Sequence, residues 1–261
     1  MSGEAALVAY VMGGDPDISA SAHVIDAVIR GGADIVEVGV PFSDPIADGK
    51  SIQAADVRAL SSGATPSLVL KMIAGVKARN PNVPVAAMTY YNILYSNGVK
   101  RFLDSAKASG VDGMIVPDLP LDEFREYSKH AKAAGLDTIL LAAPTTDPSR
   151  MKAIVAHTSG FLYLVSLTGV TGARSEVQQA TLDLIRYARK FTRGKVPLGV
   201  GFGISTPDHV RAVVNAGADA VVVGSGIVDR VASYDTAGSA VTLVKIIEYV
   251  RSLKEATRKT A

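Results

Sequence analysis

Two carboxylates, Glu37 and Asp48, are the side chains best placed to do acid–base chemistry. Glu37 lies within the apolar run 35–40 (IVEVGV), which is typical of a buried strand. Because side chains alternate along a strand, Glu37 shares its face with Ile35 and Gly39, opposite the valines. Burial raises the pKa of a carboxyl, which suits a group that must both give and take a proton. We interpret Glu37 as catalytic; the alternative is a structural glutamate held by a hydrogen bond.

The segment 41–49 (PFSDPIADG) follows that strand directly and carries Asp44 and Asp48. Its prolines stiffen it, and Asp48 precedes a glycine, so its carboxylate could reach back over the end of the strand. Aspartate is also common in solvated turns. The residues alone therefore leave Asp48 open between a catalytic role and a turn role, and they favour the turn role for Asp44.

Three glycine-rich segments follow the later apolar runs: 168–173 (TGVTGA), 201–205 (GFGIS) and 224–227 (GSGI). Backbone amides without side chains can converge on an anion, and in βα barrels the loops after strands 7 and 8 frequently hold a phosphate. We expect a phosphate site there, with the Ser225 hydroxyl as a further donor. Glycines needed only for tight turns are the alternative. The long polar segment 168–177 is typical of a lid, or else of a plain surface loop.

Several other chemistries are disfavoured by what the predicted strands lack. They contain no lysine for a Schiff base, and the four histidines, at positions 23, 130, 157 and 209, fall in predicted helices. The chain has no cysteine. We therefore expect no metal site and no cofactor in this chain, and chemistry done by carboxylates alone.

These residues must be positioned by a strand-then-helix unit that recurs eight times. Short apolar runs alternate with amphipathic segments, as in parallel strands connected by helices. The predicted strands are 7–12, 35–40, 83–89, 113–117, 138–143, 161–167, 196–202 and 220–224. The predicted helices are 19–30, 66–79, 99–108, 122–134, 149–157, 178–191, 207–215 and 236–256. Eight units without a linker favour one (β/α)₈ barrel domain over residues 1–261. A doubly wound open sheet is less consistent, because the first strand runs into Gly13-Gly14-Asp15-Pro16 rather than G-x-G-x-x-G.

Gly-x-Asp triplets at 32–34, 110–112, 135–137 and 217–219 separate predicted helices from the strands that follow. The glycine can end a helix in the left-handed conformation. These joins fall at the floor of a barrel, away from its chemistry, so we interpret them as structural. Asp147-Pro148 and Thr206-Pro207 are typical helix starts.

Composition narrows the function classes. The 261 residues include 48% hydrophobic and only 6% aromatic residues, with 27 basic and 25 acidic side chains. The near-balanced charge and the lack of a Lys/Arg stripe give no indication of nucleic-acid binding. No membrane span or signal peptide is evident, so we expect a cytoplasmic protein without membrane contact.

The segment 37–49 resembles the signature of the tryptophan synthase alpha chain family. The likeness continues in order through 116–120 (VPDLP), 163–166 (YLVS), 169–173, 201–205 and 224–225, and it spans nearly the whole chain. It implies a carbon–carbon lyase of tryptophan biosynthesis that cleaves indole-3-glycerol phosphate to indole and glyceraldehyde 3-phosphate.

The resemblance also implies roles for individual residues. Glu37 matches the family's acid/base, and Asp48 matches the carboxylate that stabilises the positive ring nitrogen. Tyr163 matches a tyrosine at the site, although aromatic packing inside the barrel remains open for it. Thr171 matches a lid residue that touches Asp48. The remaining matches are the phosphate cradle and the ring pocket: Gly172, Gly203, Gly224 and Ser225, then Tyr10, Ile115, Phe202 and Ile204.

A partner is implied as well: the tryptophan synthase beta chain, which carries pyridoxal phosphate and takes up the indole in an α₂β₂ heterotetramer. Asp44, Pro45 and Ile46 match the loop that meets it.

Two departures from the bacterial pattern stand out. The first strand starts at about residue 7, so we expect little or no N-terminal helix under the barrel floor. Leu167 stands where bacterial members commonly have a basic residue, so lid closure would rest on other contacts.

Two rival functions remain at this point: another phosphate-binding barrel enzyme, such as an isomerase of histidine or tryptophan synthesis, and a non-catalytic regulatory subunit.

Overall fold

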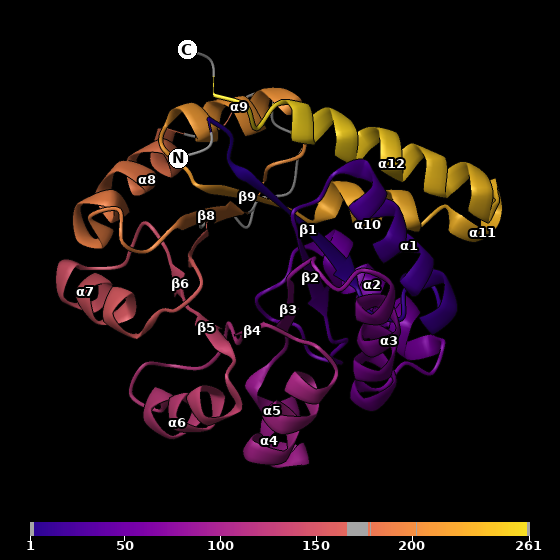
Figure 1. Cartoon of the computed structure of the whole chain (residues 1–261), viewed down its shortest axis with the longest axis horizontal. Helices are drawn as coiled ribbons and strands as arrows, with labels where there is room; N and C mark the ends of the chain where they lie inside the picture. Colours follow the sequence, from indigo (N-terminus) through magenta and orange to yellow (C-terminus); the bar gives the residue numbers. More distant parts are fainter. Residues whose placement is uncertain (1–2, 166–176, 178, 202, 260–261) are drawn as a thin grey trace.

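All strands of the structure belong to one parallel sheet that closes on itself (Figure 1). The computed structural model describes residues 3–165, 177, 179–201 and 203–259. The strand order is β5-β4-β3-β2-β1-β9-β8-β7-β6. The strands are β1 (Ala6–Met12), β2 (Ile35–Gly39), β3 (Val85–Met88), β4 (Gly113–Ile115), β5 (Asp137–Ile139), β6 (Leu141–Ala142), β7 (Leu162–Val165), β8 (Leu198–Gly201) and β9 (Ala220–Val223).

The two edges of this sheet are adjacent in the chain. Only Leu140 separates β5 from β6, so the polypeptide itself completes the circle where the ladder is interrupted. We predicted one strand over 138–143, and the structure has these two short ones instead. The eight expected strand positions are otherwise present, and the predicted (β/α)₈ barrel is confirmed.

Helices surround the barrel on the outside (Figure 1). They are α1 (Ile18–Gly31), α2 (Lys50–Ser61), α3 (Pro66–Arg79), α4 (Tyr91–Asn97), α5 (Val99–Ala108), α6 (Phe124–Ala134), α7 (Pro148–His157), α8 (Gln179–Thr192), α9 (Pro207–Asn215), α10 (Ser225–Val231), α11 (Tyr234–Ala237) and α12 (Ser239–Glu255). Each predicted helix is present. The last one is divided into α11 and α12 by Gly238, whose φ of 86° interrupts the helical backbone.

The structure adds α2, α4 and α10, which we did not predict. Each of them follows a strand at the carboxyl end of the barrel and precedes another helix. Within the described residues, no single helix has the length and hydrophobicity needed to cross a membrane. The pair of α2 and α3, bent by 99°, meets that criterion only when the two helices are counted together.

Apolar side chains fill both faces of the sheet. Val36, Val38 and Val40 are buried in the large cluster between strands and helices. A smaller cluster occupies the inside of the barrel and contains Val8, Ala86, Ile115, Ile139, Phe161, Tyr163, Ala220 and Val222. This interior follows from the alternation of side chains along each strand.

The Gly-x-Asp joins have the structural role expected of them. Gly32, Gly110, Gly135 and Gly217 all have positive φ, from 70° to 105°. Three of the aspartates accept a hydrogen bond from the first or second residue of a neighbouring strand. Leu7 N–H donates to Asp34 Oδ2 (2.7 Å), Val85 N–H to Asp112 Oδ2 (2.9 Å) and Leu198 N–H to Asp219 Oδ2 (2.8 Å). A cation neutralises each of these carboxylates: Lys254, Lys77 and Arg189 respectively.

The chain's last described segment pairs with the residues that precede β1. Ala5 N–H donates to Thr257 O (3.0 Å), and Lys259 N–H donates to Gly3 O (2.8 Å). Among the described residues, which begin at Gly3, no helix precedes β1. We expected little or no helix at this position, and this part of the chain has none.

The aspartate joins generate a stability prediction. Replacing Asp219 with alanine removes the acceptor of the Leu198 N–H and the charge partner of Arg189, which keeps its bond to the Gly217 carbonyl oxygen. Unfolding should therefore become easier by about 1–2 kcal/mol. Urea denaturation measures this. Asp208→Ala is the control, because among the described residues its carboxylate forms an ion pair with Arg211 alone, on an exposed helix face. Its loss should change stability by less than about 0.5 kcal/mol. Equal losses in both variants would contradict the structural role of the joins.

Candidate active site

Glu37 projects from β2 into the barrel interior, where it has no access to solvent. Its exposed fraction is 0%. The sheet register places it beside Tyr10 on β1 and Ala86 on β3, and both of those side chains are buried. The strand alternation had indicated this face, and the apolar cluster around Val8 and Ile115 lies on it as well.

The carboxyl of Glu37 has neither a cation nor a hydrogen-bond donor among the described residues. Its pKa is raised to about 8, mainly by burial and to a smaller extent by the negative charge of Asp48. An isolated carboxylate is costly in an apolar interior, so the group keeps its proton instead. At neutral pH Glu37 is therefore chiefly a carboxylic acid, able to donate.

Asp48 lies over the mouth of the barrel in the irregular segment between β2 and α2. The Tyr90 hydroxyl donates to Asp48 Oδ2 (2.8 Å) and accepts from Ala47 N–H (2.9 Å). Burial raises the pKa of Asp48, and the hydrogen bond from Tyr90 partly offsets this. Asp48 is only partly buried, so its carboxylate remains accessible from the mouth.

Tyr90 was missed by sequence reasoning. It follows β3 by two residues, at the carboxyl end of the barrel, and its ring stacks on Phe42 with 5.0 Å between centroids. Its position at the end of a strand was the one available signal. Its partners lie more than 40 residues away in the chain.

Asp56, on α2, is a second residue that the sequence did not reveal. It is 2% exposed, and its Oδ1 accepts from Phe42 N–H (3.0 Å). Burial raises its pKa to about 7, the Phe42 hydrogen bond opposes this, and the charges of Asp48 and Asp15 add to it. Asp15 is itself paired with Arg58 through two bonds of 2.7 Å. The helix α2 thus anchors the segment that carries Asp48.

Two tyrosines line the interior near these carboxyls, each fitted against a strand glycine. Tyr10 and Tyr163 are both 6% exposed. A Cβ at Gly39 would lie 2.2 Å from the Tyr10 hydroxyl, and one at Gly201 would lie 2.6 Å from that of Tyr163. Burial and then the nearby carboxylates raise the pKa of both tyrosines, so both hydroxyls stay neutral. The ring centroids of Tyr163 and Phe161 lie 5.9 Å apart, so Tyr163 also contributes to packing inside the barrel.

The described part of the expected phosphate cradle lies after β8 and β9. Gly203 has φ of 77°, and a Cβ there would meet nothing within 4 Å. Gly224 and Ser225 lie where β9 passes into α10. Ile204 and Ile115, two of the proposed ring-pocket residues, are buried. Thr171, Gly172 and Phe202, and also Leu167, lie outside the described residues.

The segment expected to meet a partner is exposed. Ile46 has 85% of its surface accessible, the largest value among the exposed hydrophobic residues. Asp44 is exposed and accepts a hydrogen bond from the Ser43 hydroxyl (2.6 Å), and Pro45 is half-buried.

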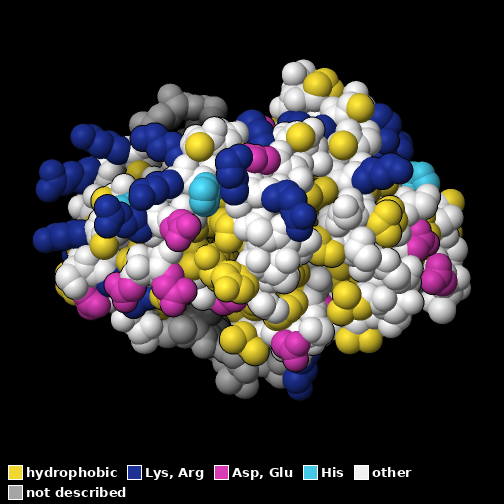
Figure 2. All heavy atoms as spheres, turned by 90° about the horizontal axis from the view of Figure 1, so that it is seen from below, with side chains coloured by type: hydrophobic (Ala, Val, Ile, Leu, Met, Phe, Trp, Pro, Cys, Tyr) yellow, Lys and Arg dark blue, Asp and Glu magenta, His cyan; other side chains and the backbone are white. Residues whose placement is uncertain are grey.

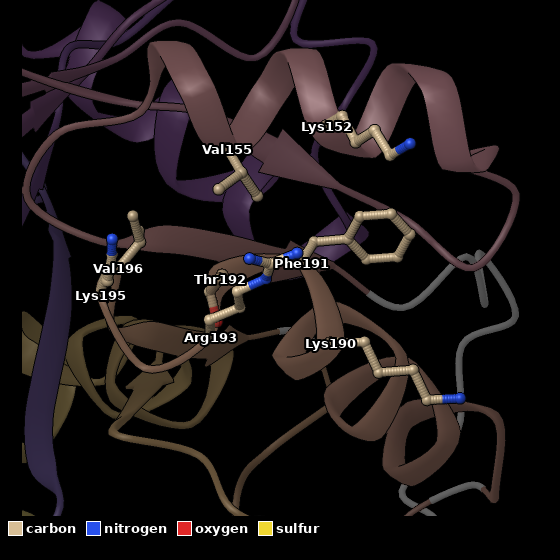
Figure 3. Close-up of a pocket in the computed structure, with 8 residues that line it drawn as sticks. All are labelled: Lys152, Val155, Lys190, Phe191, Thr192, Arg193, Lys195 and Val196. Atoms are coloured by element: carbon tan, nitrogen blue, oxygen red, sulfur yellow. The ribbon is translucent and has the colours of Figure 1, made fainter.

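A surface depression of about 570 Å³ lies away from this mouth, between α7 and the end of α8 (Figure 3). Lys152, Lys190, Arg193 and Lys195 line it, and Figure 2 shows basic side chains gathered on that side of the molecule. In Figure 3 the Lys152 and Lys190 side chains extend away from Arg193. The cations do not converge, so this depression is not a built ligand site. Among the described residues, no group of three histidine or acidic side chains is placed to hold a metal.

Comparison with known proteins agrees with this arrangement. The profile of the tryptophan synthase alpha chain family matches residues 1–258. The chain is 44% identical to the tryptophan synthase alpha chain of Microcystis aeruginosa over 254 residues, which cover 97% of this chain and 94% of that one. It is 46% identical to that of Methanocaldococcus jannaschii over 226 residues, 87% and 79% of the two chains.

Solved structures give the same result. The tryptophan synthase alpha subunit of Pyrococcus furiosus superposes with a TM-score of 0.88 at 38% identity, covering 97% of this chain and 99% of that chain. A chain in the tryptophan synthase complex of the same organism superposes with a TM-score of 0.87 at 37% identity and the same coverage. This chain therefore belongs to the tryptophan synthase alpha chain family.

Proposed function

We propose that Glu37 and Asp48 carry out the retro-aldol cleavage of indole-3-glycerol phosphate to indole and glyceraldehyde 3-phosphate, the reaction of this family. The observation that carries the proposal is the Glu37 carboxyl, 0% exposed in an apolar interior and without a hydrogen-bond partner among the described residues. Structural carboxyls elsewhere in this chain, such as Asp34 and Asp219, have both a backbone donor and a cation.

The cleavage needs two proton transfers, and one carboxyl can perform both. Glu37 donates its proton to indole C3, which leaves the ring nitrogen positive. The resulting carboxylate takes the proton from the glycerol hydroxyl. The electron pair of that O–H bond forms the aldehyde, and the electrons of the breaking carbon–carbon bond return to the ring. Glu37 ends the cycle protonated, as it began, and a pKa near 8 suits both steps.

Asp48 stabilises the positive ring nitrogen in this proposal. A carboxylate aimed at the place where charge develops lowers the barrier most in a site that excludes water. Tyr90 supports this role because its hydroxyl donates to Asp48 while holding Ala47 in place. The acidic surroundings, with Asp56 close by, also favour a cationic ring.

The remaining groups bind the substrate. Gly203, Gly224, Ser225 and Gly172 would hold the phosphate through backbone amides and one hydroxyl. Tyr10, Ile115, Phe202 and Ile204 would surround the ring, with Tyr163 beside Glu37. Thr171 would meet Asp48 when the lid closes and water is excluded.

We further propose a tryptophan synthase beta chain as the partner, with pyridoxal phosphate bound in that chain and none in this one, in an α₂β₂ assembly. The support is the exposed Ile46, flanked by Asp44 and Pro45, close in sequence to Asp48. Burying so exposed an aliphatic side chain would favour association by about 1.5–3 kcal/mol.

Glu37→Gln tests the central assignment. The amide keeps the shape of the side chain but cannot transfer the proton, so indole release should fall below about 10⁻² of the wild-type rate, with folding intact. Indole formation from indole-3-glycerol phosphate is measured with the beta chain present and absent. Unchanged indole release, or release rescued in the complex, would favour a regulatory subunit. Failure of the wild type to release indole at all would favour another barrel enzyme.

Asp48 and Tyr90 are predicted to act as one unit. Asp48→Asn should lower kcat by about 10²–10⁴-fold, and Tyr90→Phe by a smaller factor of about 3–30-fold, since it removes one hydrogen bond to the carboxylate. In the double variant, Tyr90→Phe should add little to Asp48→Asn, because its effect passes through Asp48. Tyr91→Phe, at the next position, is the matched control. Fully additive losses would show that Tyr90 acts independently of Asp48.

A further inference from the structure

Tyr249, on α12, reaches from the outer helix layer to the back of the expected phosphate cradle. Its hydroxyl donates to the Ser205 carbonyl oxygen (2.7 Å), although 44 residues separate the two in the chain. Ser205 is two residues beyond Gly203, in the segment after β8. The hydroxyl therefore fixes one side of the cradle from behind, without facing the barrel interior.

The same hydroxyl occupies the space where a side chain at Gly226 would be. A Cβ at Gly226 would lie 2.1 Å from Tyr249 Oη and 2.9 Å from Cζ. The backbone of Gly226 is not in the left-handed region, so its conformation does not require glycine. The requirement is steric, and it links Tyr249 to the Gly224–Gly226 segment after β9, the other side of the cradle.

Arg230 holds the tyrosine ring in this position. Its guanidinium carbon lies 3.5 Å from the ring centroid, and its Nη1 donates to the Gly226 carbonyl oxygen (2.6 Å). A cation over an aromatic face is attractive. Burial raises the pKa of Tyr249 while the charge of Arg230 opposes this, and the hydroxyl stays a donor at neutral pH.

We propose that Tyr249, Gly226 and Arg230 form a latch that sets the spacing of the two phosphate-binding segments, 203–205 and 224–226, and so the affinity for the phosphate group of the substrate. The latch rests on the proposed function, because it presumes that phosphate binds there. Tyr249 is a positioning residue: it contacts the cradle from behind and acts on substrate through Ser205 and Gly226.

The latch should affect binding rather than chemistry. The phosphate is remote from the carbon–carbon bond that breaks, and contacts equally strong in ground and transition states change KM without changing kcat. A change in the spacing of the cradle should therefore weaken the binding of every ligand that carries a phosphate. It should affect the ring pocket less, because the segment 203–205 contributes only Ile204 among the described pocket residues.

Tyr249→Phe removes the hydroxyl and keeps the ring under Arg230. We expect KM for indole-3-glycerol phosphate and the dissociation constant of glycerol 3-phosphate to rise by the same factor, about 2–10-fold, for the loss of one hydrogen bond. The value of kcat should stay within about twofold, and the dissociation constant of indole should not change. Tyr187→Phe, on α8, is the matched control and should leave all four quantities unchanged.

A size-compensation pair tests the steric part. Gly226→Ala alone places a methyl group against the tyrosine hydroxyl and should weaken glycerol 3-phosphate binding by more than tenfold. Adding Tyr249→Phe removes the nearest clashing atom and leaves Cζ, which lies 2.9 Å from the added Cβ. The double variant should therefore recover part of the binding of glycerol 3-phosphate that Gly226→Ala loses. Gly75→Ala, on α3, is the glycine control, since a Cβ there meets only the far end of Arg79 at 3.7 Å.

Three results with the variants would contradict the latch, and a fourth with the wild type would contradict the cradle on which it rests. One is a Tyr249→Phe protein that binds glycerol 3-phosphate as the wild type does. Another is a double variant no better than Gly226→Ala. The third is a parallel loss of indole and glycerol 3-phosphate binding with a lowered unfolding midpoint, which is the mark of a loosened fold. If the wild type itself fails to bind glycerol 3-phosphate while still releasing indole, the proposed cradle is wrong and the latch falls with it.

Discussion

The proposed chemistry depends on the desolvation of one carboxyl group. Glu37 is held inside an aliphatic barrel, and the strands on either side place Tyr10 and Ala86 against it instead of a cation. This arrangement is costly to folding. The folded chain keeps a proton that the unfolded chain releases above its ordinary pKa of 4.5. The stability that this proton supports is present at low pH and is lost as the pH rises towards about 8. At neutral pH the buried Glu37 therefore lowers the stability of the folded chain, but it provides a protonated carboxylic acid in the site.

The second carboxylate, Asp48, is held by long-range contacts and not by a place in the sheet. Asp48 lies on an irregular segment, and several long-range contacts fix that segment: Tyr90 bonds to Asp48 and Ala47, and Asp56 holds Phe42. Glu37 is positioned by its place in the sheet, between Tyr10 on β1 and Ala86 on β3. The contrast fits the proposed catalytic pair, in which Glu37 must be shielded from water while Asp48 must remain accessible to the ring nitrogen.

The sequence predicted those features that follow from local spacing. Alternation along the run 35–40 placed Glu37 on the inner face, and Gly-x-Asp triplets marked the helix-to-strand joins that the structure confirms. Tyr90, Asp56 and Tyr249 were not predicted, because their partners lie 14 to 44 residues away and no spacing rule links them. The break at Leu140 was missed for a similar reason, since it arises where the two ends of the ladder meet. The short helices α2, α4 and α10 carry or adjoin these missed contacts.

A titration of the Glu37 carboxyl shows whether this group is a neutral acid at physiological pH. Carbon-13 NMR of protein labelled at glutamate side-chain carboxyls follows the ionisation of each group, and the spectrum of the Glu37→Gln protein identifies the Glu37 signal. We expect that signal to titrate with a midpoint near 8. A midpoint near 4.5, the ordinary value for glutamate, would contradict the account.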